Sequence, residues 1–523
     1  MVDKKPQSVL RGIGVLILGR IPSRILGLVR EILTASLFGA GWVMDSFNLS
    51  LTAVTSLRMF FAEQISIPIV PTFFQRKNKE GDAAAYHSVR VISTLMTILA
   101  VVVSVLLLFF ADVVTTWMAP GFDAEARKLS ILLLRCFSVG GAGIILHKYY
   151  SSLHTCFFRY NAVAFAPLTF NMFIIISIVF FGSRVGVISL ASGIALGYLA
   201  YFLTLFITLP KRAELTKPAF DWKDPGLRQY IWMLLPLYLA VSVEQVQLFV
   251  DRALASHLPE GSLSSQGYAL RLVKMFADFI IAIFLNVLFP VFSSLAQSNK
   301  RQEFARQFSL TLQAVILLMA IAGSVMVGLA LPGVRTILER GSFEYADSVR
   351  TAELIGLYFI AIGSQTLYIV ISRGFNAHGD TRTPMITTII SVSVIIAADF
   401  ALVGSMGIKG LALALAIGYS LNAVLMYLLF SRYLEAKHHW KNLRIFTIGI
   451  GLAVLLGWTL KISWDKIAAT SLVDSFFLRT GLLTLISLLA VGLFLGALKV
   501  FKIEALGYIL KKYRSRTKNK PIV

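Results

Sequence analysis

The sequence has little cysteine and few acidic residues. Of 523 residues only 2 are cysteine, and 27 Asp and Glu stand against 49 Lys and Arg. Cys136 and Cys156 are expected on one helix about 30 Å apart, so neither a disulfide framework nor a cysteine metal centre is predicted. No long loop carries clustered carboxylates that could serve as a base or bind a metal. These absences argue against a secreted disulfide scaffold and against a metal-dependent enzyme.

Hydrophobic residues dominate instead, at 57% of the chain. Apolar runs of about 20 residues recur, which is the length an α-helix needs to cross a bilayer core. We therefore predict an all-α polytopic membrane protein with about 14 transmembrane helices. The predicted spans lie near residues 8–38, 44–72, 88–112, 129–156, 161–181, 185–209, 227–256, 264–292, 307–331, 350–375, 383–404, 407–431, 442–462 and 476–500.

The excess of positive charge, +22 in total, follows the predicted loops. Outside the spans given above, 24 Lys and Arg lie in the N-terminus, alternate loops and the C-terminal tail, against 6 in the opposite loops. The positive-inside rule then places both termini in the cytoplasm, and nucleic acid is not an expected partner. No cleaved signal is expected, because Lys4 and Lys5 lead straight into the first span. The basic tail after Lys499 would lie on anionic headgroups or be solvated.

The chain contains an internal repeat. Corresponding features recur at a slowly growing offset of 213 to 221 residues, namely Arg58 and Arg271, Pro22 and Pro236, Pro167 and Pro384, and the segments Val185–Tyr198 and Met406–Tyr419. Six spans in each copy make this a parallel repeat of the kind that transporters use. We predict an N-terminal six-helix lobe over 1–212, a C-terminal six-helix lobe over 213–435, helices 13–14 over 436–500 and a basic tail over 501–523.

Charged residues interrupt the first two predicted helices, between Arg20 and Glu63. At 100° per residue, Arg20, Arg24 and Glu31 share one face of the first helix, and Arg30 lies roughly 80–120° away. A Gly-Ala-Gly turn follows, and the second helix then carries further charges at Asp45, Arg58 and Glu63. An arginine at mid-membrane costs about 2.5–3.5 kcal/mol, so it normally faces protein or a water-filled cavity. The alternative is that arginines near helix ends extend to the headgroups.

The second half adds Arg271 and Lys274 to this set of cations. Transporters built from repeats bind substrate between their halves, close to interrupted helices. A guanidinium binds phosphate or carboxylate through two parallel hydrogen bonds, whereas lysine acts as a point charge. A cavity with four or five cations and few acids therefore predicts an anionic substrate, for which pyrophosphate is a natural candidate.

Several motifs resemble those of the MurJ (MviN) lipid II flippases, in the multidrug/oligosaccharidyl-lipid/polysaccharide exporter superfamily. The closest are S-R-I-L-G-L-V-R-E from Ser23, F-G-A-G-x-x-x-D-S-F from Phe38 and L-R-x-x-F-A-E from Leu57. Further matches are A-F-A-P-L-x-x-N from Ala164, Y-A-x-R-L from Tyr268 and G-F-x-x-x-x-D-T-R-T-P from Gly374. The motifs span both halves in the order of that family, which also has fourteen helices.

The resemblance implies a carrier that moves the undecaprenyl-pyrophosphate-linked peptidoglycan precursor, lipid II, across the bacterial inner membrane by alternating access. Spans 13 and 14 would hold the polyprenyl tail, and cell-wall synthesis machinery would be a further partner. The chain departs from the family at Glu31, where Asp is common, and at Leu270, where an acid often precedes the arginine. The substrate-binding residues that the resemblance implies are Arg24, Arg30, Arg58, Arg271 and Asp45. The predicted site also includes Ser23, Glu63 and Lys274.

Two other functions remain open at this point. A sibling exporter would carry O-antigen or capsule repeat units on the same lipid pyrophosphate, although the two added helices and the S-R-x-L-G-x-x-R motif disfavour it. A polyprenyl-phosphate glycosyltransferase would need the clustered carboxylates that the chain lacks. No cofactor is expected beyond a coupling ion.

The coupling ion is predicted from two acids in the second half. Asp251 and Asp399 lie within predicted spans, where an unpaired carboxylate takes up a proton or binds a cation. Arg252 is expected to be a poor partner for Asp251, since neighbours on a helix point about 100° apart. The resemblance adds that some relatives bind sodium between the corresponding helices. The alternative places Asp399 near the outer headgroups and Asp251 near a loop.

Overall fold

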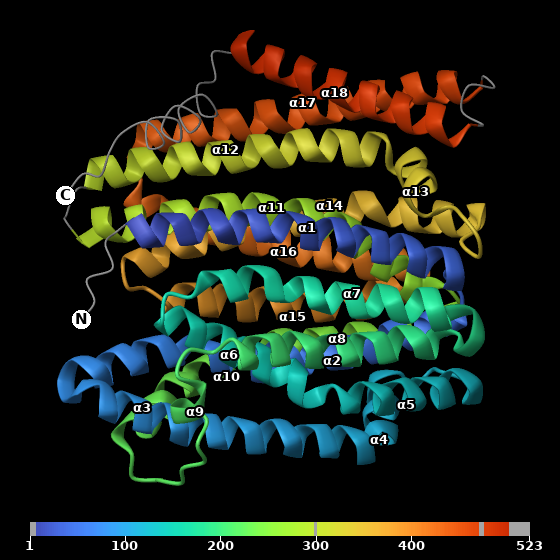
Figure 1. Cartoon of the computed structure of the whole chain (residues 1–523). Helices are drawn as coiled ribbons and strands as arrows, with labels where there is room; N and C mark the ends of the chain where they lie inside the picture. The colour runs from blue at the N-terminus through green and yellow to red at the C-terminus, as the bar shows by residue number, and fades with distance from the viewer. Residues whose placement is uncertain (1–6, 298–300, 470–474, 501–523) are drawn as a thin grey trace. The chain divides into compact units, whose positions relative to one another are not determined.

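The computed structural model describes residues 7–297, 301–469 and 475–500, and the predicted basic tail lies outside them. All regular structure within these ranges is helical, apart from one β-bridge between Arg340 and Phe343 (Figure 1). The chain forms two compact units, Met1–Ser264 with Arg340–Glu344, and Ser265–Glu339 with Tyr345–Val523. The two units are defined by packing contacts, whereas the predicted lobes are defined by the sequence repeat. The lobe boundaries therefore stay a prediction.

The first unit contains eleven helical elements. They are α1 (Gln7–Phe38), α2 (Trp42–Leu57), the π-helical turn η1 (Arg58–Glu63), α3 (Gln64–Phe109), α4 (Ala111–Met118), α5 (Ala124–Val139), α6 (Gly141–Cys156), α7 (Tyr160–Val185), α8 (Val187–Ile207), α9 (Arg212–Leu215) and α10 (Pro225–Ala255). Helix α7 packs against both α1 and α8, and α3 packs against α6 and α10.

The second unit takes up the chain within α11 (Ser262–Gln297). It continues through α12 (Arg301–Gly328), α13 (Ala330–Leu338), α14 (Tyr345–Ala377), α15 (Arg382–Met406), α16 (Ile408–Phe430), the short turn η2 (Ser431–Tyr433), α17 (Ala436–Ala468) and α18 (Phe476–Val500). Helix α17 lies along α12, and α18 along α17 (Figure 1). Gly328 allows this close approach, because a Cβ there would come within 2.6 Å of the Gly457 carbonyl oxygen.

The helices confirm a multi-pass membrane protein. Nine described helices are long and apolar enough to cross a bilayer, or ten if the bent pair α5 and α6 forms one span. Helices α1, α10 and α11 add 32, 31 and 36 residues, which is also sufficient length. All fourteen predicted ranges fall largely on helices, but the number fourteen itself stays a prediction.

Two breaks in the helices depend on glycine. Gly81, with φ of 85°, interrupts α3 and separates two of the predicted spans within one helical run. The bend of 44° between α5 and α6 occurs at Gly140, where a Cβ would lie 2.5 Å from the Ala195 carbonyl oxygen. The predicted span over 129–156 is therefore two helices, with Cys136 half-buried on the first and Cys156 buried on the second.

Candidate substrate site and its surroundings

Arg30 is held at the contact between α1 and α7. Its Nη2 donates to Glu31 Oε1 at 2.7 Å, and its Nη1 lies 3.5 Å from Asn171 Oδ1. Asn171 in turn donates to the backbone oxygen and the hydroxyl of Ser23, at 3.2 and 3.1 Å. The predicted residues Ser23, Arg30 and Glu31 therefore form one hydrogen-bonded group, which Asn171 completes.

Arg58 is held by a second polar group. It pairs with Glu63, and Lys148 Nζ from α6 lies 3.0 Å from the other Glu63 oxygen. A π-helix closes hydrogen bonds between residues five apart, so the η1 turn brings Arg58 and Glu63 onto one face. The three side chains are between 25% and 35% exposed, so they are accessible to a ligand. Two cations share one carboxylate, which leaves this group with a net positive charge.

Tyr198 on α8 lies near both arginine groups, close enough for the charges of Arg30 and Arg58 to influence its hydroxyl. Its ring lies 4.6 Å from that of Phe170 and 5.2 Å from that of His147, measured between centroids. The first unit therefore brings together two of the predicted arginines beside an aromatic group.

The other predicted cations are distributed over both units. Arg24 is half-buried on α1 of the first unit. Arg271 and Lys274 lie on α11 in the second unit, where Arg271 is half-buried with its Cζ 4.8 Å from the centre of the Tyr268 ring, and Lys274 is exposed. The predicted convergence of Arg271 with the arginines of the first half stays a prediction.

Asp45 does not contact Arg30, Arg58 or the groups that hold them. One carboxylate oxygen accepts from the Gly261 backbone N–H at 2.7 Å, and the other from that of Ser264 at 2.6 Å. Glu260 makes the reciprocal contact, because its Oε1 accepts from the backbone N–H of Trp42 at 2.9 Å. The starts of α2 and α11 therefore cap each other. Whether Asp45 also contacts substrate stays a prediction.

The two acids predicted to bind an ion are both buried, at 6% exposure for Asp251 and 0% for Asp399. Arg252 Nη1 lies 3.8 Å from Asp251 Oδ2, which is a long ion pair beyond hydrogen-bond distance and agrees with the expectation that Arg252 is a poor partner. Asp251 and Asp399 belong to different units, so their sharing of an ion stays a prediction.

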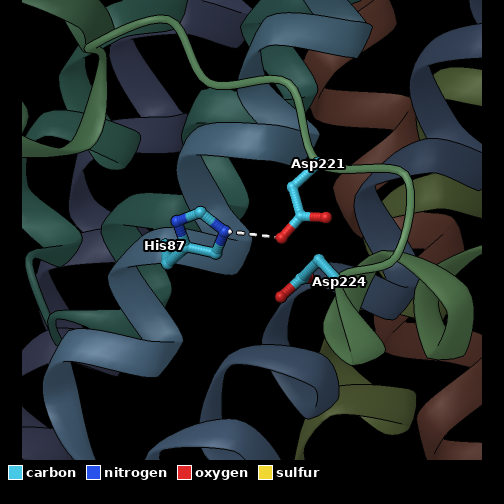
Figure 2. Close-up of side chains that lie close together, drawn as sticks. All are labelled: His87, Asp221 and Asp224. Carbon is cyan, nitrogen blue, oxygen red and sulfur yellow. Dashed lines mark hydrogen bonds and ion pairs between the residues drawn. The ribbon is translucent and has the colours of Figure 1, made fainter.

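A cluster that the sequence did not reveal fastens the segment before α10 to α3 (Figure 2). His87 Nε2 lies 3.1 Å from Asp221 Oδ2, and Asp224 accepts from the hydroxyl of Ser88 at 3.0 Å. The His87 contact, together with the Lys223 backbone N–H, lowers the pKa of Asp221. In the sequence this cluster consists only of a histidine and two aspartates, and the aspartates lie 134 and 137 residues after the histidine. Such a separation gives no signal of a shared site.

The ligand atoms of His87, Asp221 and Asp224 all lie within 4.8 Å of one another, which is close enough to share a metal ion. The surroundings favour hydrogen bonding instead. Arg76 Nη2 lies 3.5 Å from Asp224 Oδ1, and Asp224 Oδ2 caps α10 by accepting from the Leu227 N–H at 2.8 Å. A metal ion would compete with both contacts and would be repelled by the Arg76 guanidinium. We therefore interpret the cluster as a structural contact that holds the segment before α10 against α3.

Solved structures show the same fold. The chain superposes on a structure described as "Lipid II flippase MurJ, inward closed conformation" with a TM-score of 0.74 and 21% identity, covering 93% of this chain and 99% of that one. A multidrug resistance MATE family transporter of the MOP superfamily, in an inward-facing conformation, gives a TM-score of 0.69 at 14% identity, over 78% and 94% of the two chains. The chain therefore shares its fold with both of these structures.

Sequence comparison identifies the family. A protein of Thermotoga maritima described as a probable lipid II flippase MurJ is 28% identical over 95% of this chain and 97% of its own. The lipid II flippase MurJ of Burkholderia cenocepacia is 27% identical over 90% and 94% of the two chains. The family model described as "Lipid II flippase MurJ" matches residues 34–494. Since that match covers most of the sequence, the chain belongs to the lipid II flippase MurJ family.

Proposed function

We propose that this protein is a lipid II flippase, which moves undecaprenyl-pyrophosphate-linked peptidoglycan precursor from the cytoplasmic to the outer leaflet. Its family membership supports this function. The observation that carries the proposal is the pair of half-buried arginine groups in the first unit, around Arg30 and around Arg58. They offer positive charge to a pyrophosphate inside a helical membrane protein.

The arrangement suggests how a phosphate would be bound. Glu31 and Glu63 hold Arg30 and Arg58 in place, each through one carboxylate, and guanidinium groups have further N–H donors in a planar fork. A pyrophosphate would accept from these remaining donors and compete with Glu63 for Arg58 and Lys148. Such binding would favour the transporter state in which the substrate contacts are strongest, because a ligand shifts an equilibrium only by its difference in affinity for the two states.

Helices α17 and α18 provide apolar surface for the polyprenyl tail. Large hydrophobic side chains project from both, with Val454, Leu455 and Trp458 on α17 and Leu488 and Leu493 on α18 each more than 60% exposed. We propose that this pair of helices holds the tail while the first unit binds the headgroup.

The function is tested in cells and with the purified protein. Depletion should leave lipid II on the cytoplasmic leaflet, protected from an externally added enzyme that cleaves it. Proteoliposomes with the purified protein should expose lipid II to the same enzyme faster than protein-free vesicles. Unchanged accessibility in both assays would contradict the proposal. Transport of an O-antigen lipid in place of lipid II would favour the sibling exporter, for which no observation speaks at present.

The predicted topology has a separate test. If both termini are cytoplasmic in the inner membrane, single cysteines at Lys79 and Lys217 should resist an impermeant thiol reagent in intact cells. A cysteine at Glu344 should react with it. All three side chains are exposed, so protein burial would not protect any of them. Equal labelling at the three positions would contradict the fourteen-span topology.

We also propose that Asp251 and Asp399 bind sodium or a proton that couples to the conformational change. Burial supports this, since a buried carboxylate is costly unless it is paired, protonated or bound to a cation. In Asp251→Asn and Asp399→Asn, the effects of sodium and pH on the cysteine accessibility of the purified protein should be weaker, while lipid II binding stays largely intact. A response to both ions equal to that of the wild type would exclude the two acids as the coupling site.

A further inference from the structure

A second basic site lies at one end of the second unit, and none of the residues that line it is a predicted substrate residue. A pocket of about 370 Å³ opens where α12 begins and where α14 and α16 end. Its polar lining consists of Arg301, His378 and Arg432, and its apolar lining includes Leu295, Phe304 and Tyr433. Helices that cross a membrane end at the headgroups, so this pocket would lie at that level.

The cations of the pocket exceed the acids that contact them. Arg301 donates from Nη2 to the backbone oxygen of Arg432 at 2.7 Å, which draws the two arginine residues together. Arg432 pairs with Asp380 at 3.1 Å. Asp380 also accepts from the backbone N–H and the hydroxyl of Thr383, at 3.0 and 2.7 Å. Among the contacts of the described residues, the two guanidinium groups therefore have one carboxylate partner, Asp380, which pairs with Arg432 and also accepts from Thr383.

The floor of the pocket is a packed aromatic cluster. The His378 ring lies 4.5 Å from the ring of Phe304 and 4.2 Å from that of Tyr433, measured between centroids. Gly374 allows this packing, because a Cβ there would come within 2.5 Å of Phe430. His378 Nδ1 lies 2.9 Å from the Gly374 carbonyl oxygen, so Nδ1 carries the proton. The arginines therefore lie beside packed aromatic rings. These rings would not need to become ordered when a ligand binds.

We propose that this pocket binds the phosphate of an anionic phospholipid headgroup. Basic pockets between transmembrane helices bind such headgroups, and guanidinium groups bind phosphate through paired hydrogen bonds. The apolar side chains of Leu295 and Phe304 suit the glycerol and the start of the acyl chains. The distribution of positive charge predicts that the lipid comes from the cytoplasmic leaflet. Inorganic phosphate or a soluble phosphate ester would share this chemistry but lack the acyl chains.

The test measures lipid binding to the purified full-length protein in detergent by native mass spectrometry. Phosphatidylglycerol should bind more tightly than phosphatidylcholine, and the double variant Arg301→Ala with Arg432→Ala should weaken it about 30-fold, since each basic residue near a membrane surface adds about a factor of five. The matched control is Arg382→Ala with Lys441→Ala, which removes two exposed charges of the same unit that do not line the pocket. The single variant Arg301→Ala, which loses one hydrogen bond, serves if the double variant does not fold.

The outcomes separate the sources of phosphate. Selective loss of phosphatidylglycerol in the pocket variants, with the control unchanged, supports the proposal. Equal binding by the wild type and the pocket variants overturns it, as does displacement of the lipid by millimolar inorganic phosphate, which would indicate a site for a soluble anion. Lipid II transport is measured in parallel, so that loss of phosphatidylglycerol binding can be distinguished from failure of the proposed function.

Discussion

Replacing Arg30 or Arg58 with alanine is expected to abolish lipid II transport while the protein still inserts and folds. Hydrogen bonds to charged groups contribute about 1.5–3 kcal/mol each, so loss of one guanidinium should weaken pyrophosphate binding by roughly ten- to a hundredfold. The substitution also changes the local charge balance. Without Arg58, Glu63 keeps its ion pair with Lys148 at 3.0 Å, and the net positive charge of this group is lost. The measurement is growth on the variant alone, together with lipid II accessibility in proteoliposomes.

Lysine variants separate charge from geometry at the same positions. Arg30→Lys and Arg58→Lys keep the charge and lose the planar fork, so they should restore transport only in part. Arg184→Ala is the control, because Arg184 lies exposed at the end of α7, apart from both arginine groups. Arg24→Ala and Arg271→Ala extend the test to the two other predicted site arginines. Normal growth of all four alanine variants would contradict an anionic substrate.

The sequence predicted the membrane helices well, because a span of about 20 apolar residues is a local property. It also identified Arg58 and Glu63 as charges inside a span, but their pairing depends on the π-helical turn. On a regular α-helix residues five apart point about 140° away from each other, so the pairing could not be predicted from helix periodicity. Lys148 could have been found by the rule that located the arginines, since it also lies within a predicted span.

Contacts between distant segments were the part that the sequence could not supply. Asn171 was visible only as part of a family motif, and its role in joining Ser23 to Arg30 required the packing of α1 against α7. Similarly, His87 and Asp221 carry no spacing signal because they meet through tertiary packing. Polar partners on separate helices depend on helix register and rotation, which apolar patterns define only coarsely.

The contacts of Asp45 also depend on packing between distant segments, and they predict an effect on stability. From the sequence it was a substrate-binding candidate, whereas the structure shows both of its oxygens accepting from backbone N–H groups of Gly261 and Ser264. A carboxylate at this position offsets the unsatisfied donors and the positive end of the helix dipole at the start of α11. If capping is its role, its loss should destabilise the protein without directly weakening substrate binding.

Asp45→Ala is therefore expected to lower the free energy of unfolding by about 2 kcal/mol, because it leaves two buried N–H groups without an acceptor. Asp45→Asn should cost less, since the amide oxygen can still accept one of the two bonds. Glu260→Gln removes a charge from the reciprocal cap but keeps an acceptor for the Trp42 N–H, so its effect should be smaller again. Asp112→Asn is the control, because the pair of Asp112 with Arg127 is exposed.

Two measurements on the same purified Asp45 variants separate the two roles. Thermal unfolding should follow the order of the lost hydrogen bonds, with the alanine variant the least stable and the Asp112→Asn control close to wild type. Lipid II binding, measured at a temperature where all variants are folded, should stay within about threefold of wild type in Asp45→Asn. Wild-type stability combined with lost lipid II binding would instead assign Asp45 to the substrate, as the sequence suggested, and would mean that the contact with Gly261 and Ser264 adds little to stability.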